Sequence, residues 1–168
     1  MESVKHPIVR VAKQYEDEIV YKSLTLYFDP SYNPEKNIRQ HGIMEADFKD
    51  LRKGEIVYFH YLSVDPSPQL PPNCWLIAYG MLYCVIRDDK IVMLNKYNLI
   101  TIEEEKEKSS LITIGKTSTT QGFIAHTSHK DLKIGDEVLF RPRAAFVNEI
   151  ENQEFYLVES EDILCIIK

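Results

Sequence analysis

This chain of 168 residues lacks several sequence features that would indicate a particular class of function. No apolar stretch approaches the roughly 18 residues of a membrane-spanning helix, and residues 1–7 contain no apolar signal segment. No run of Lys or Arg occurs and the net charge is −6, which argues against a nucleic-acid partner. We therefore expect a cytosolic protein that binds neither a membrane nor a nucleic acid.

Helical patterning is also missing. No segment carries an apolar stripe at helical spacing over roughly ten residues. Short runs rich in β-branched and aromatic residues take its place, separated by Gly, Pro, Asn and Asp. They predict strands within residues 8–13, 54–62, 74–86, 90–94, 98–102, 111–114, 123–125, 137–140 and 154–158. Many short strands with regular turns are typical of an all-β sandwich or barrel.

Motifs for catalysis or metal binding are incomplete. Residues 115–117 read Gly-Lys-Thr, but a phosphate-binding loop needs glycine at position 110, where this chain has Ser110. His126 and His129 would point to opposite faces of a strand, and no Cys or carboxylate completes a zinc set at recognised spacing. A polar loop and two separate histidines are the simpler interpretations. We expect no enzyme, no cofactor and no metal.

Cysteine is scarce, and the three present cannot all pair within one chain. Cys84 and Cys165 both lie inside apolar runs. We expect each to be a small buried residue of a strand, with a disulfide or redox role as the alternative.

The second half of the chain repeats the first at a spacing of 81 residues. Between residues 49 and 87, nine of 39 positions are identical to the residue 81 places later. These nine are Lys49, Asp50, Leu51, Gly54, Val57, Phe59, Leu76, Cys84 and Ile86. A repeat of this length is long enough to be a small domain. We therefore predict two domains, residues 1–92 and 93–168, joined near the tight turn expected at Asp88–Asp89.

Four blocks of the sequence carry a family resemblance. Residues 49–59 and 130–140 share the pattern Lys-Asp-Leu-x-x-Gly-[Asp/Glu]-x-Val-x-Phe. Residues 154–167 read Glu-Phe-Tyr-Leu-Val-Glu-Ser-Glu-Asp-Ile-Leu-Cys-Ile-Ile, and residues 29–42 contain Asp-Pro, Pro-Glu-Lys, Arg and Gly in that order. Together these blocks resemble the GroES-like co-chaperonin family, present as two tandem copies. The resemblance implies an all-β fold of two irregular β-barrels.

The resemblance also implies a function. Members of the GroES-like family form a homo-oligomeric ring that closes a GroEL-like chaperonin cage as a lid and assists ATP-dependent protein folding. They bind the chaperonin large subunit through an apolar tripeptide in a mobile loop, which corresponds here to Leu24-Thr25-Leu26 and Ile112-Thr113-Ile114. The family's preceding glycine pair is absent and Thr replaces the middle apolar residue. An ordinary half-buried strand is therefore the alternative for each triplet.

The chain's last apolar run is the expected subunit interface. In the family, the end strands of neighbouring subunits pair, which would place Ile163, Leu164, Ile166 and Ile167 in that contact. The alternative is that this strand only completes its own barrel. The intervals 42–54 and 122–135 leave no room for the hairpin that often roofs the ring.

A second functional hypothesis is a structural protein, for example of a virus particle, that reuses the barrel without a chaperonin partner.

Overall fold

A computed structural model describes residues 5–11, 18–21, 24–27, 40–60, 63, 70–102, 120–141 and 146–167. Every regular element in this part of the chain is a β-strand or a single turn of 3-10 helix, which confirms the all-β prediction. The chain divides into two compact units, Met1–Asn95 and Lys96–Lys168. None of the described segments forms a helix with the length and apolarity to cross a membrane.

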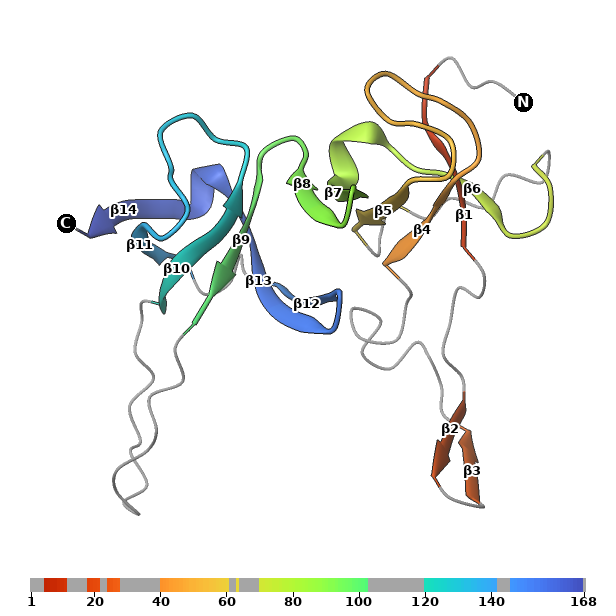
Figure 1. The fold of residues 1–168 in the computed structure, drawn as a ribbon. Helices are drawn as coiled ribbons and strands as arrows, with labels where there is room; N and C mark the ends of the chain where they lie inside the picture. The colour runs from red at the N-terminus through yellow and green to blue at the C-terminus, as the bar shows by residue number, and fades with distance from the viewer. Residues whose placement is uncertain are drawn as a thin grey trace. The chain divides into compact units, whose positions relative to one another are not determined.

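The first unit is built on a six-stranded antiparallel sheet (Figure 1). Its order is β6-β1-β4-β5-β7-β8, and a 3-10 turn at Tyr79–Met81 precedes β7. The hairpin between β7 and β8 turns at Asp88 and Asp89, whose φ angles are 51° and 55°. Two positive φ angles match the twist of the flanking strands, so the predicted tight turn is confirmed. The strands are β1 (Ile8–Arg10), β4 (His41–Met44), β5 (Ile56–Phe59), β6 (Cys74–Leu76), β7 (Leu82–Arg87) and β8 (Lys90–Met93).

The second unit contains another six-stranded antiparallel sheet, in the order β12-β13-β9-β10-β11-β14 (Figure 1). A 3-10 turn at Ser160–Asp162 precedes the last strand. The strands are β9 (Tyr97–Thr101), β10 (Thr120–Thr127), β11 (Glu137–Phe140), β12 (Phe146–Ile150), β13 (Gln153–Glu159) and β14 (Ile163–Ile167).

A third element is a two-stranded ribbon that β2 (Glu18–Tyr21) and β3 (Leu24–Tyr27) form with each other. It precedes β4 in the chain, and in the part of the chain that the structure describes it shares no strand pairing with the two larger sheets.

The two large sheets share a five-strand order. The strand order β6-β1-β4-β5-β7 in the first sheet corresponds to the order β13-β9-β10-β11-β14 in the second. The register shifts at Tyr58/Phe59 where β5 meets β7, and at Leu139/Phe140 where β11 meets β14. These shifts lie 81 residues apart, the spacing of the sequence repeat. The sheets differ in their extra strand, since β8 extends the first beyond β7 and β12 extends the second beyond β13.

The turns before β5 and β11, the fourth strands of this order, have a glycine at the equivalent position. Gly54 and Gly135 both have φ of +90°, a conformation in which a side chain would be strained. The Gly54 N–H donates to the Met44 carbonyl at 2.8 Å, and the Gly135 N–H donates to the Ile124 carbonyl at 2.8 Å. The repeated glycine is therefore conformational in origin.

A carboxylate closes each of these turns. The Arg52 N–H donates to Oε2 of Glu55 at 2.8 Å, and the Lys133 N–H donates to Oδ2 of Asp136 at 2.8 Å. This local hydrogen bond explains why the repeat retains an acidic residue directly after the glycine.

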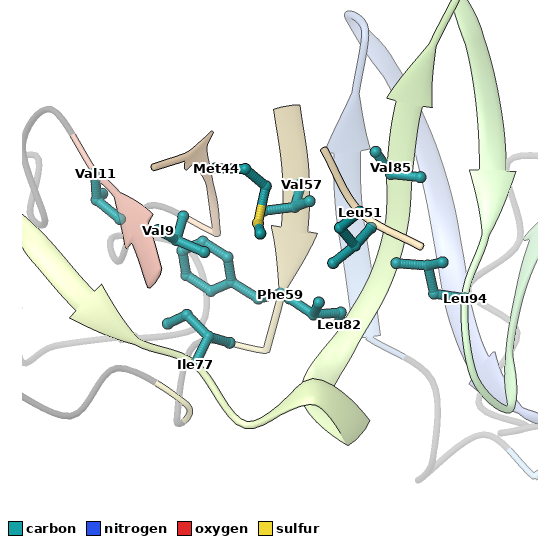
Figure 2. Packing of buried hydrophobic residues seen from close by; sticks show 10 residues of the cluster. All are labelled: Val9, Val11, Met44, Leu51, Val57, Phe59, Ile77, Leu82, Val85 and Leu94. Carbon is teal, nitrogen blue, oxygen red and sulfur yellow. The ribbon is translucent and has the colours of Figure 1, made fainter. Parts of the chain in front are cut away.

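Two of the repeated apolar residues lie in the cores of both units. Phe59 and Val57 are fully buried in the first unit, and their equivalents Phe140 and Val138 are fully buried in the second. Figure 2 shows the first cluster, where side chains from several strands converge. It comprises Val9, Val11, Met44, Leu51, Val57, Phe59, Ile77, Leu82, Val85 and Leu94. The second cluster comprises Ile100, Ile124, Val138, Phe140 and Val158.

A partly buried ion pair makes the first unit sensitive to acid. Nε of Arg87 lies 2.6 Å from Oε1 of Glu55, and this hydrogen bond holds the pKa of the Glu55 carboxyl below its usual value. The unfolded chain therefore takes up the Glu55 proton at a higher pH than the folded chain does. The stabilisation is complete above the unfolded pKa of about 4.3 and is lost as pH falls through the folded value.

We expect Glu55→Gln to lower the free energy of unfolding by about 1.5 kcal/mol at pH 7, the lower end of the scale for a hydrogen bond to a charged group. The difference from wild type should shrink as the pH falls below about 4, because the wild-type carboxyl then becomes protonated. Urea denaturation at a series of pH values measures this difference in the free energy of unfolding. A difference that is independent of pH would show that the charge of Glu55 contributes nothing.

Candidate functional site

The first predicted binding triplet lies on the ribbon. Leu24, Thr25 and Leu26 are the first three residues of β3, which pairs with β2. Leu24 is 56% exposed, a large fraction for an apolar side chain, and Thr25 is exposed as well. The triplet is thus in a strand, as the alternative held, but this strand belongs to neither of the large sheets. The described part of this segment presents an apolar side chain to solvent.

The second predicted triplet, Ile112-Thr113-Ile114, lies outside the described residues, and so does the Gly-Lys-Thr segment at 115–117. The role of that triplet stays a prediction.

The four predicted interface residues lie together on β14. This strand pairs with β11 through Val138↔Ile166 and Glu137↔Ile167, and it is the last strand of its sheet. Leu164 is 50% exposed and Ile166 is 36% exposed. Ile163 and Ile167 are half-buried. The strand therefore completes its own sheet and also leaves an apolar edge open to solvent.

The repeat supplies an internal comparison for this edge. Val85 and Cys84 of β7 are the equivalents of Ile166 and Cys165, and both are fully buried. β7 is an inner strand because β8 pairs with it through Cys84↔Met93 and Val85↔Val92. No strand of the described residues takes that place beside β14. The prediction that Cys165 is buried is therefore wrong, since Cys165 is exposed on an edge strand, whereas the prediction for Cys84 is confirmed.

A buried polar residue that the sequence analysis missed helps to position β14. Asn98 of β9 is fully buried, and its Nδ2 donates to the Val158 carbonyl at 3.2 Å and to Oγ of Ser160 at 3.0 Å. Oγ1 of Thr127 donates to Oδ1 of Asn98 at 2.6 Å. Because Ser160 begins the turn into β14, these bonds tie the path of that strand to the sheet. Its polarity gave no sign of burial, since Asn is usually exposed.

The start of β14 is also held by Arg141, which follows β11. Its N–H donates to the Asp162 carbonyl at 3.1 Å, and its Nη1 lies 2.9 Å from Oδ1 of Asp162. The last strand is therefore fixed to its own sheet before any partner is present.

The two histidines considered as metal ligands have separate surroundings. His126 lies in β10 with its ring edge-on to Phe155 at a centroid distance of 5.9 Å, and burial lowers its pKa. His129 lies in the following turn, where its Nδ1 accepts the Asp131 N–H at 3.3 Å. Within the described ranges, no three His, Cys, Asp or Glu side chains gather as potential metal ligands.

Comparison with known proteins bears on these surfaces. Residues 90–167 match the family described as "Chaperonin 10 Kd subunit". Over 68 residues the chain is 32% identical to "Co-chaperonin GroES" of Geobacter sulfurreducens. The matched stretch covers 40% of this chain and 70% of that protein. The chain belongs to the chaperonin 10 family.

Membership of the chaperonin 10 family confirms the resemblance for the second half of the chain and supports a co-chaperonin function in general. A co-chaperonin is a partner protein and not itself an enzyme. The matched residues begin at Lys90, so they include β8 as well as β9 to β14. In sequence β8 thus belongs to the chaperonin 10 segment, whereas in space it pairs with β7 of the first unit.

Proposed function

We propose that this protein is a co-chaperonin that forms a ring-shaped lid on a GroEL-like chaperonin cage in the cytosol and assists ATP-dependent protein folding there. Membership of the chaperonin 10 family is the observation that carries the proposal. The exposed Leu24 on a ribbon outside the two sheets supports it, because an exposed apolar side chain on a small element suits reversible docking.

The chain acts in this proposal as two tandem GroES-like β-barrels, residues 1–92 and 93–168. The shared five-strand order supports this division, and so do the register shifts 81 residues apart and the matched turns at Gly54 and Gly135. Agreement at this many separate points is expected of two copies of one fold and not of unrelated sheets.

The β7–β8 pairing suggests how chains assemble. β8 belongs in sequence to the second copy, yet it covers the end strand of the first copy. β14 is the corresponding end strand of the second copy and exposes Leu164 and Ile166. We infer that another chain covers β14 in the same manner, with Ile163, Leu164, Ile166 and Ile167 at the interface. A repeated head-to-tail contact of this kind closes a ring when the rotation between neighbouring chains divides a full turn evenly.

Docking uses Leu24-Thr25-Leu26 and Ile112-Thr113-Ile114, two segments for each chain. Each contact is weak because ordering the segment costs entropy. A ring presents many such segments at once, so the second and later contacts form within one complex and make the capping strong.

The direct test mixes the protein with a GroEL-type chaperonin and ATP and looks for capped complexes by electron microscopy and pull-down. We expect Leu24, Leu26, Ile112 and Ile114, all changed to Ser, to abolish capping. Each change removes an apolar contact worth about 1.5–3 kcal/mol when buried. Leu24 and Leu26, the described residues among these four, lie outside both large sheets. The far-UV circular dichroism of the variant should therefore stay close to that of the wild type.

Capping that persists in the fourfold variant would place the contact elsewhere. A protein that assembles into rings but never binds the chaperonin would support the alternative, a GroES-like structural or assembly protein.

A further inference from the structure

The β2–β3 ribbon has a pairing register that extends the candidate docking surface beyond the triplet. Tyr21 lies opposite Leu24, and Ile19 lies opposite Leu26. Residues directly opposite each other in an antiparallel pair share one face, and successive residues of a strand alternate between faces. One face of the ribbon therefore holds four residues, Ile19, Tyr21, Leu24 and Leu26.

The opposite face differs in composition. It holds Glu18, Val20, Thr25 and Tyr27, of which Glu18 and Thr25 are polar. The Thr of the triplet thus belongs to a different face from its two leucines. This explains why a polar residue is tolerated at the middle of a docking triplet.

Among the strands that the structure describes, β2 and β3 pair only with each other. A two-stranded hairpin alone is only marginally stable in water, and an apolar face gains stability when another surface covers it. Leu24, the first residue of β3, is 56% exposed.

We propose that the docking surface is this whole face of the ribbon, so that Ile19 and Tyr21 of β2 contact the chaperonin together with Leu24 and Leu26. The inference rests on the proposed function and specifies its partner's chemistry: an apolar groove wide enough for two paired strands, which lie about 4.8 Å apart. Pairing the two strands in advance also lowers the entropy that docking must overcome.

The experiment compares two neighbouring residues of β2 in the full-length protein. Ile19→Thr and Val20→Thr both exchange a β-branched residue for another β-branched residue, so strand propensity changes little in either. Ile19 belongs to the apolar face and Val20 to the opposite face. With a GroEL-type chaperonin and ATP, we expect Ile19→Thr to weaken binding about tenfold or more, and Val20→Thr to stay within about twofold of wild type.

Leu26→Thr is the reference that separates this inference from the proposed function. Weaker binding by both Leu26→Thr and Ile19→Thr, with Val20→Thr unaffected, supports the ribbon face. Weaker binding by Leu26→Thr alone overturns the inference and leaves the triplet as the docking site. A wild-type protein that fails to bind, or binding that Leu26→Thr leaves unchanged, overturns the inference together with the proposed docking site.

Discussion

Replacing Gly122 by alanine is expected to destabilise the second unit by about 3 kcal/mol, the upper part of the usual range for an overfilled core. A Cβ atom at Gly122 would lie 2.5 Å from Cγ2 of Ile100 and 2.7 Å from the Thr101 carbonyl oxygen. Both distances are well inside van der Waals contact. β9 cannot withdraw, because it is hydrogen-bonded between β13 and β10 in the middle of its sheet.

The chain offers matched controls for this substitution. Gly42→Ala should have the same effect on the first unit, since its Cβ would lie 2.6 Å from the Arg10 carbonyl oxygen. Gly80→Ala should change the stability by less than about 0.5 kcal/mol, because no described residue beyond its two chain neighbours has an atom within 4 Å of the added Cβ.

Urea denaturation measures all three variants. The chain's single tryptophan, Trp75, lies in β6, so its fluorescence reports on the first unit, whereas far-UV circular dichroism reports on both. A midpoint for Gly122→Ala equal to that of Gly80→Ala would contradict the close approach of β9 and β10.

Replacing Ile166 by lysine is expected to dissociate the proposed ring into single chains of 19.6 kDa. Ile166 lies on the edge strand β14 and is 36% exposed, whereas its equivalent Val85 is fully buried under the pairing of β7 with β8. A lysine on an edge strand is the device by which natural sheets prevent pairing with another chain. We expect the association to weaken at least 100-fold, or about 2.7 kcal/mol.

Val147→Lys is the control for this substitution. Val147 is 48% exposed on β12, the edge strand at the opposite end of the same sheet. It adds the same charge to the same unit, and it should leave the association unchanged. Sedimentation velocity separates the assembled protein from single chains.

Cys165 supplies a second measurement, since it is exposed on β14. Its thiol should react with a maleimide slowly in the assembled wild type and quickly in Ile166→Lys. An assembly that survives Ile166→Lys, or one that Val147→Lys also disperses, would remove β14 from the interface.

Two strands show where prediction from the sequence stopped. β4 contains Gly42, a residue that disfavours strands, and it was not predicted. The glycine is needed because β1 approaches too closely for any Cβ atom. In β12, the exposure alternates along the strand as expected, but the buried position of Asn148 is polar and hides the period-two pattern. The first reason lies in a neighbouring strand, and the second lies in β12 itself.

The sequence by itself determined most of the strand-forming segments and several of the turns, since these depend on nearby residues. Gly54 and Gly135 specify positive φ angles, and the apolar runs after them predict the strands that follow. The repeat also indicated that two similar units would form. Only the tertiary structure decided which strands are inner and which lie at an edge. Cys84 and Cys165 occupy equivalent positions in similar runs, yet one is buried and the other exposed. Burial depends on whether a neighbouring strand covers the residue, and that neighbour comes from elsewhere in the chain.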